Sequence, residues 1–209
     1  GTVVDSERLY NVVKHTQETM PTALLVESSA ASGSYLAALG ADKIYAHHGS
    51  IIGSIGVISR HYVLEGLLDS MGIKKEEFKT GRFKGYPDSL EVMPEEVRQS
   101  YEKMIDGIFS WFLNMVKTHR SLANTSAIEE AQIYSARDAL ELGLIDGIST
   151  EQEQLNVLRE AVGDLPVRDL SVDETDIFGL SKVFKAAYVK SFIQDIRGES
   201  ASGLVASIH

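Results

Sequence analysis

The sequence contains no cysteine, has fewer basic than acidic residues, and lacks long apolar runs. Without cysteine the chain can form no disulfide and can supply no thiol nucleophile. Its 20 Lys and Arg residues against 30 Asp and Glu give a net charge of −10, which disfavours nucleic acid and anionic membrane surfaces as partners. No apolar run approaches the ~20 residues that span a bilayer. These absences exclude cysteine-based chemistry and disfavour a nucleic-acid-binding role.

The chain has 209 residues, of which 44% are hydrophobic and 24% are charged. That length and composition are typical of one globular domain with a sizeable core. The first residues, GTVVDSERLY, have no initiator methionine and no signal-peptide pattern. We therefore expect the sequence to be a fragment or a processed form of a longer chain.

Short strand patterns alternate with helix patterns along most of the chain. The expected strands lie at residues 22–27, 43–46, within 49–59, at 73–81 and at the end of 135–148. The later expected helices lie at 35–41, 62–72, from Pro94 towards His119, at the start of 135–148, at 151–162 and at 180–196. Alternation of this kind favours an α/β layered fold with a mainly parallel sheet flanked by helices.

The N-terminal segment is expected to form a helix that is capped by Asp5 and ended by Pro21. Helical spacing predicts that this helix buries an apolar face made of Leu9, Val12, Val13 and Met20. Two later helices are expected to stop at Gly72 and Gly143, because glycine adopts the left-handed conformation that ends helices.

The histidines and glycines give no cofactor signal. The six histidines show no pair at metal-ligand spacing with a supporting carboxylate. A Ser-His-Asp triad stays open, since its members can lie far apart in a sequence. The glycines of GSIIGSIG, residues 49–56, lack the spacing of a dinucleotide-binding loop, and close packing explains them better. We expect neither a metal nor a cofactor.

Ser32 is the candidate nucleophile that the pattern singles out. It follows an expected strand and starts an expected helix in SSAASGSYLAAL, residues 28–39. A side chain at such a junction is exposed at the carboxyl end of the strand, where free N–H groups of the helix also point. Two interpretations stay open: Ser32 caps the helix, or Ser32 is a nucleophile. A serine nucleophile needs a base, and a lysine made neutral by burial could serve.

Two segments form a linked pair of motifs. Residues 30–57 read AASGSYLAALGADKIYAHHGSIIGSIGV, and residues 78–85 read FKTGRFKG, in which a lysine follows a Thr-Gly pair by three residues. Together they resemble the signal peptide peptidase A (SppA) family of Ser/Lys peptidases. The similarity extends from GTVVDSERLY to IYSARDALELGLIDGI, over residues 1–148. The pair of motifs is specific, whereas either motif alone would be weak.

The resemblance implies roles for five residues. Ser32 is the implied nucleophile, and Lys84 is the implied general base. Ser54 matches a serine whose hydroxyl orients the lysine amine. The backbone N–H groups of Gly33 and Gly1 are implied to form the oxyanion hole.

Three features depart from the family pattern. Gly33 is followed by Ser34 where a second glycine is usual, and we expect from this a modest change in the turn or the pocket wall. AHHGS, residues 46–50, stands where a proline-containing turn is common, which we interpret as surface variation. The strands and the membrane anchor that family members carry before the glycine loop would lie upstream of Gly1.

The resemblance implies a serine endopeptidase with a ClpP/crotonase-like fold that cleaves remnant signal peptides or other extended apolar peptides through an acyl-enzyme. Residues 1–150 would form the peptidase core, and residues 151–209 a helical extension of the same domain. The expected partners are peptide substrates and further copies of the chain in a ring. The expected location is the bacterial cell membrane, with the catalytic domain on the extracytoplasmic side.

Three alternatives to this function stay open. A phage prohead-type Ser/Lys protease would share the chemistry and differ in substrate. A ring-forming pseudoprotease would use Ser32 only as a helix cap. A crotonase-type acyl-CoA enzyme would share the fold but would lack the Ser/Lys pair.

Overall fold

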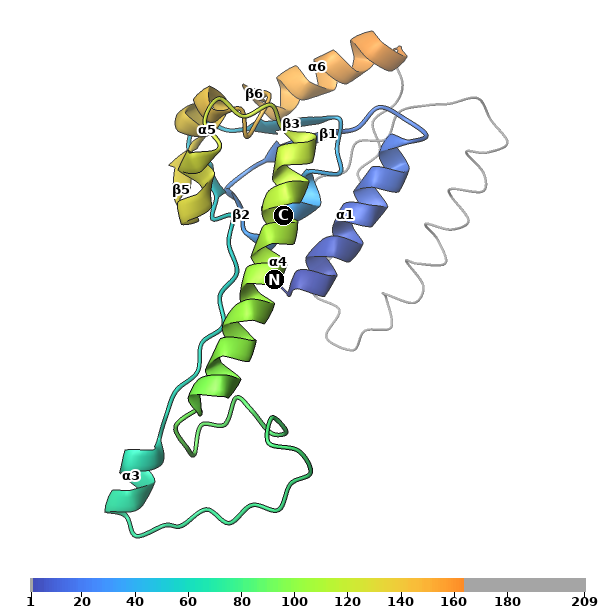
Figure 1. Cartoon of the computed structure of the whole chain (residues 1–209). Helices are drawn as coiled ribbons and strands as arrows, with labels where there is room; N and C mark the ends of the chain where they lie inside the picture. Colours follow the sequence, from blue (N-terminus) through green and yellow to red (C-terminus); the bar gives the residue numbers. More distant parts are fainter. Residues whose placement is uncertain (1, 164–209) are drawn as a thin grey trace, which may run out of the picture. The chain divides into compact units, whose positions relative to one another are not determined.

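The computed structural model describes residues 2–163 (Figure 1). In chain order the elements are α1 (Val3–Gln17), β1 (Ala23–Val26), β2 (Ser29–Ala31), α2 (Gly33–Ala38), β3 (Lys43–Ala46), β4 (Ile51–Gly53), α3 (Glu65–Ser70), α4 (Glu95–His119), the 3-10 helix η1 (Ser126–Glu130), β5 (Ile133–Ser135), α5 (Ala136–Leu142), β6 (Gly147–Ile148) and α6 (Glu151–Val162). The described residues divide into two compact units. The first comprises the residues up to Ile55 together with those from Met115 onward, and the second comprises Gly56–Asn114.

Two three-stranded sheets lie in the first unit. One has the order β1-β3-β6 and is parallel throughout. In the other, β2 pairs in parallel with β4, and β4 pairs antiparallel with β5. Parallel neighbours need crossover connections, and here helices supply them. The pairing confirms the expected α/β class with mainly parallel strands and flanking helices.

Helix α2 lies in the core of the first unit. Each residue from Tyr35 to Ala38 is buried. The fully buried hydroxyl of Tyr35 donates to the carbonyl oxygen of Leu144 at 2.7 Å. Leaving a buried hydroxyl without a partner would cost ~1–3 kcal/mol, so this bond fixes α2 against the turn that follows α5. Other fully buried side chains come from the neighbouring strands and from that turn: Ile44, Ile52 and Leu144.

The start of α1 differs from the expectation. The hydroxyl of Thr2 caps the helix by accepting the N–H of Asp5 at 3.2 Å, and it donates to the Asp5 carboxylate at 2.7 Å. Asp5 therefore lies in the first turn, and the prediction that it is the N-cap was wrong. The physical reason is that Thr2, placed three residues earlier, supplies the side-chain oxygen that a cap requires.

The buried face of α1 also differs from the expectation. Leu9 and Val12 are 50% and 64% exposed, whereas Ser6 is 4% exposed. Helix α1 approaches Gly40 so closely that a Cβ there would lie 2.7 Å from the carbonyl oxygen of Tyr10. Backbone contact of this kind is possible only beside small residues. Ser6 is the residue of α1 that is buried, in place of the larger apolar side chains.

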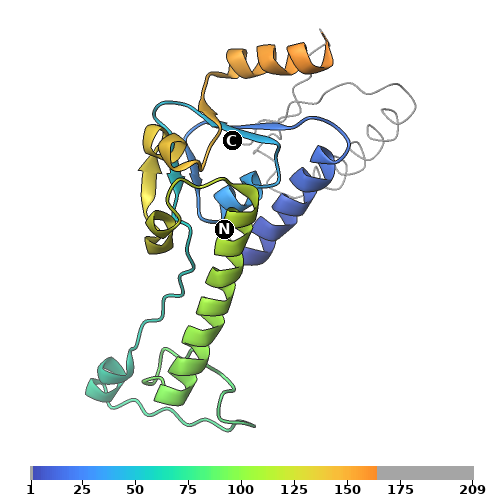
Figure 2. The same cartoon turned by 45° about the horizontal axis from the view of Figure 1, so that its top comes forward.

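The segment from Ser135 to α6 follows the sequence prediction. The Ser135 hydroxyl caps α5, and Gly143 ends that helix with a left-handed φ of 81°. Helix α6 starts with a capping box between Thr150 and Glu153, and it contacts β1 (Figure 2). The segments 165–172 and 180–196 and the C-terminal tail lie outside the described residues. The domain boundary at residue 150 stays a prediction.

The second unit, residues 56–114, contains α3 and most of α4 but no strand. Helix α4 has the extent predicted from the sequence, while α3 is shorter than the expected 62–72 and buries no side chain. The strand predicted at 73–81 was wrong, because no strand of this unit is present to pair with its backbone N–H and C=O groups. Ion pairs hold the segment instead, including Lys75 with Asp88 and Lys79 with Glu77.

Candidate active site

Ser32 lies at a sharp junction between β2 and α2. The helix start was predicted, but the expected strand at 22–27 is β1, and the short strand β2 that leads into Ser32 was not predicted. Its backbone has φ 55° and ψ −120°, and a positive φ is uncommon for a residue with a side chain. Such a conformation costs ~1–3 kcal/mol, and strain of this kind is concentrated at functional sites. Although Ser32 stands at the N-cap position, its side chain makes no capping hydrogen bond. Its hydroxyl is therefore not committed to capping α2.

The backbone of Ser32 is fixed on both sides of the junction. Its N–H donates to the carbonyl oxygen of Gly53 at 2.8 Å, and its own carbonyl oxygen accepts the N–H of Leu36 at 3.0 Å. The first N–H groups of α2, beginning with that of Gly33, have no partner within the helix. Unpaired N–H groups beside a serine can stabilise an oxyanion that forms there.

Ser54 follows β4, which is the parallel neighbour of β2. Because Ala31 lies opposite Gly53 in the register, Ser32 and Ser54 leave the same sheet as neighbours at its carboxyl end. Ser54 also has a left-handed φ, of 49°, and its N–H donates to the carbonyl oxygen of Gln132 at 2.7 Å. Both serines of the candidate site therefore lie in strained turns.

Gly53 makes the turn before Ser54 possible. It has φ 112°, and a Cβ at this position would lie 2.7 Å from the carbonyl oxygen of Gln132 and 2.9 Å from the ring of Tyr134. The Tyr134 hydroxyl donates to the carbonyl oxygen of Ala127 at 2.5 Å, which anchors the ring. The role of Gln132 and Tyr134 in shaping this turn was missed, because no local pattern in the sequence marks contacts that form between distant segments.

The hydroxyl of Ser34 makes the side-chain hydrogen bonds at the junction. It accepts the N–H of Ala31 at 2.9 Å and donates to the carbonyl oxygen of the same residue at 2.8 Å. Ser34 is the residue at which a change in the turn was expected, and these bonds lie within that turn. The sequence motif could not tell which of the neighbouring hydroxyls, Ser32 or Ser34, makes the bonds.

Lys84 lies in the second unit, in a turn whose backbone is closed by a hydrogen bond from its N–H to the carbonyl oxygen of Gly81 at 3.2 Å. Its side chain is exposed, so the burial that was expected to neutralise a base lysine is not found for Lys84 in the described structure. In the described part of the chain, no hydrogen bond or ion pair engages the Lys84 amine. The amine is therefore not already held by a carboxylate.

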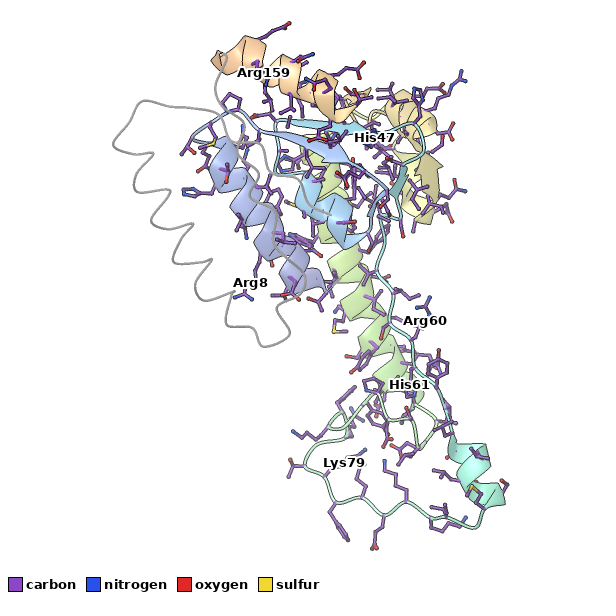
Figure 3. All side chains as sticks on the ribbon, turned by 180° about the vertical axis from the view of Figure 1, so that it is seen from behind. Arg8, His47, Arg60, His61, Lys79 and Arg159 are labelled. Atoms are coloured by element: carbon purple, nitrogen blue, oxygen red, sulfur yellow. The ribbon has the colours of Figure 1, made fainter. Side chains whose placement is uncertain are left out.

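Two other lysines of this unit are engaged by carboxylates. Lys75 contacts Asp88, and Lys79 lies 2.7 Å from Glu77; Figure 3 labels Lys79 on the long segment between α3 and α4. The hydrogen bond to Asp88 raises the pKa of Lys75, and the hydrogen bond to Glu77 raises the pKa of Lys79. An amine whose charged form is stabilised in this way is poorly suited to accept a proton near neutral pH.

The structure thus brings Ser32, Gly33 and Ser54 together in the first unit. Lys84 belongs to the second unit, and Gly1 lies outside the described residues. Among residues 2–163, no group of three or more His, Asp or Glu side chains is arranged to hold a metal ion. Over the same residues, no helix is both long and apolar enough to cross a membrane.

The family of the protein follows from its similarity to a known family. The model of peptidase family S49 matches residues 14–164, which include Ser32, Ser54 and Lys84. The chain belongs to peptidase family S49. The expected resemblance to the SppA family is thereby confirmed, because proteins named SppA are among the relatives of this S49 chain.

Two relatives indicate the range of the similarity. The S49 chain is 32% identical over 186 residues to a Methanocaldococcus jannaschii protein named "Putative protease MJ0651", covering 87% of this chain and 60% of that protein. It is 29% identical over 152 residues to "Serine protease SPPA, chloroplastic" of Arabidopsis thaliana, covering 71% of this chain and 22% of that protein. The chain therefore spans only part of the length of these relatives.

Similarity to solved structures is weaker. A mutant of the 1510-N membrane-bound stomatin-specific protease, in complex with a substrate peptide, matches with a TM-score of 0.45 and 18% identity, over 86% of this chain and 77% of that one. A score at that level does not carry conclusions about the site. The fold class of the S49 chain rests on its own strand pairing and its family.

Proposed function

We propose that the chain is the catalytic core of a serine endopeptidase in which Ser32 is the nucleophile and Lys84 the general base. The geometry at Ser32 is the observation that carries the proposal. Ser32 combines a strained backbone, a hydroxyl that caps nothing, and the unpaired N–H groups at the start of α2. A strained strand-to-helix turn exposes a nucleophile beside oxyanion donors. Because the chain belongs to a peptidase family, the reaction proposed for this geometry is peptide hydrolysis.

The proposed reaction is acyl transfer to Ser32. The neutral amine of Lys84 takes the proton of the Ser32 hydroxyl, and the oxygen attacks the peptide carbonyl carbon. The N–H of Gly33, together with that of Gly1, stabilises the oxyanion. The Lys84 ammonium then protonates the leaving amine as the C–N bond breaks. Lys84 next deprotonates a water, which attacks the ester, and Ser32 leaves with the proton returned to it.

We propose Lys84 as the general base because two other lysines of the same segment, Lys75 and Lys79, are paired with carboxylates. The carboxylates beside Lys75 and Lys79 stabilise the charged forms of those two amines. Lys84 makes no ion pair among the described residues. A base must exchange a proton in each half of the reaction, and an amine without a fixed counterion can do so more readily.

The proposed substrates are remnant signal peptides or other extended apolar peptides, cleaved at the extracytoplasmic side of a bacterial membrane. We further propose that copies of the chain assemble into a ring. The second unit exposes large apolar side chains that a neighbouring copy could cover, including Ile58 at 69%, Tyr62 at 73% and Phe78 at 89%. A native mass equal to that of one chain would argue against the ring.

Covalent labelling tests the proposed function. A fluorophosphonate should add one phosphonyl group to the protein, and peptide mapping should locate it at Ser32. The Ser32→Ala variant is the control and should take up no label. Absence of label from the native protein, or a label at another serine, would favour the pseudoprotease alternative, in which Ser32 has no chemistry.

Ser54 is proposed to orient the Lys84 amine. We expect Ser54→Ala to lower kcat/KM for a fluorogenic peptide by ~10- to 1000-fold, the range typical of disturbed acid–base catalysis. The N–H of Ser54, which bonds Gln132, is retained in the variant, so the turn itself should persist. A rate equal to that of the native protein would leave Ser54 with a purely structural role.

A further inference from the structure

The serines around the junction of β2 and α2 have different partners. Ser32 makes no side-chain bond to the helix that it precedes. Ser34, two residues later, bonds both polar backbone groups of Ala31, at 2.9 Å from the N–H and 2.8 Å to the carbonyl oxygen. A hydroxyl can donate and accept at once, which is what this pair of neighbouring backbone groups requires.

The place of Ala31 in the sheet explains why these bonds matter. Among the strands of residues 2–163, β2 is an edge strand, with β4 on one side and none on the other. The groups of an edge strand that face away from its neighbour have no ladder partner. Ser34 supplies that partner at the last residue of β2, directly before the strained backbone of Ser32.

The strained φ of Ser32 must be held by its surroundings. Gly53 and Leu36 hold the N–H and the carbonyl oxygen of Ser32 itself. Ser34 holds the carbonyl oxygen of Ala31, which belongs to the same peptide unit as the Ser32 N–H, and it also holds the N–H of Ala31. If the Ala31 groups were free to rotate, the direction of the Ser32 hydroxyl would spread over a wider range.

We propose that Ser34 is a positioning residue for the nucleophile. Its hydroxyl bonds the end of β2 to the start of α2, so that the Ser32 hydroxyl makes no bond at this junction and points toward the substrate carbonyl. The inference rests on the proposed function, since it gives Ser34 a part in the attack by Ser32. Ser34 itself touches no reacting atom and acts only through the backbone of Ala31.

Loss of the Ser34 hydroxyl should affect rate more than folding. The side chain is exposed, so its removal leaves no cavity in the core. A misplacement of the reacting atoms by about 1 Å can cost ~100-fold in rate. We therefore expect loss of this hydroxyl to slow acylation of Ser32 by ~5- to 100-fold, through kcat and with KM little changed.

The sharpest comparison is between Ser34→Thr and Ser34→Val. The two variants share a branched shape and differ only in a hydroxyl against a methyl, so any packing or helix-propensity effect is common to both. Ser34→Ala provides the simple truncation. Ser29→Ala is the matched control, because Ser29 is an exposed serine of the same strand whose hydroxyl makes no bond among the described residues.

The rate of phosphonylation at Ser32 and the kcat and KM for a fluorogenic peptide should be measured for all variants. We expect Ser34→Thr and Ser29→Ala to react at close to the native rate, and Ser34→Val and Ser34→Ala to be slower by the factor above. Equal rates for Ser34→Thr and Ser34→Val, with the native protein fully labelled, would overturn the role of Ser34 alone. Failure of the native protein to label at Ser32 would overturn the proposed function instead.

Discussion

Ser32→Ala should lower peptide hydrolysis by at least ~10⁴-fold, the scale seen when a serine nucleophile is removed from an acyl-transfer site. Alanine cannot form an acyl-enzyme, while the N–H of Gly33 and the turn at Ser54 stay in place. The variant should fold, because alanine and serine meet the same steric cost at the φ of 55° that this position requires. Hydrolysis of a fluorogenic peptide, followed beside the thermal unfolding midpoint, measures both expectations.

The residual rate of Ser32→Ala carries information of its own. Oxyanion donors and substrate binding alone leave some catalysis over water when a nucleophile is lost. A small residual rate would therefore agree with a Gly33 donor that still functions. A rate within tenfold of the native protein would show that another group attacks the peptide. Ser29→Ala, which removes an exposed hydroxyl, controls for nonspecific effects of losing a serine.

Elements whose signals are local were predicted well from the sequence. The strand at 43–46 and the helix from Glu95 to His119 have the extents that their patterns indicate. The cap at Ser135 and the stop at Gly143 also depend on neighbouring residues alone. Capping bonds and left-handed glycines form within one turn, so their signals do not depend on distant residues. The cap of α1 was nevertheless misassigned, because Thr2 and Asp5 both have side chains that can cap.

Features decided by distant contacts were not predicted. The buried face of α1 follows from its close approach to Gly40, a residue that hydrophobic periodicity does not mark. The segment 73–81 was predicted to be a strand, but no neighbouring strand is present in its unit to complete the hydrogen bonds. In both cases tertiary structure overrode a local preference.

The candidate site shows the same division. The helix start at Ser32 could be predicted, but the strand that ends before it could not, because the expected strand at 22–27 is β1 and the short strand β2 has no apolar run of its own. Its unused hydroxyl could not, because serine at an N-cap position normally bonds the helix. The left-handed turn at Ser54 depends on Gln132, far along the chain, and the sequence does not distinguish Ser32 from Ser34 as the serine that bonds Ala31. The sequence motif therefore locates Ser32, Ser34 and Ser54, whereas the backbone conformation determines which of their hydroxyls make hydrogen bonds.

Lys84→Ala and Lys84→Arg should both lower hydrolysis by ~10³- to 10⁴-fold, comparable to the loss of a residue that acts as one unit with the nucleophile. Alanine removes the base altogether. Arginine keeps a positive charge and a long side chain but stays protonated at any pH at which a protein folds, so it cannot accept the Ser32 proton. The two variants together separate the need for a base from the need for a charge.

The pH dependence of kcat/KM for the native protein tests Lys84 as the base in a second way. Only the deprotonated amine of Lys84 can act as the base, and its fraction grows as the pH rises, so kcat/KM should increase with pH. Lys74→Ala is the matched control: Lys74 belongs to the same unit, is 82% exposed and pairs with Asp69 on the surface, where an ion pair contributes little. It should keep the native rate and the native pH profile. Substantial hydrolysis by Lys84→Arg would show that Lys84 is not the base. A native rate that falls as the pH rises from neutral would show the same. In either case a histidine would become the candidate base.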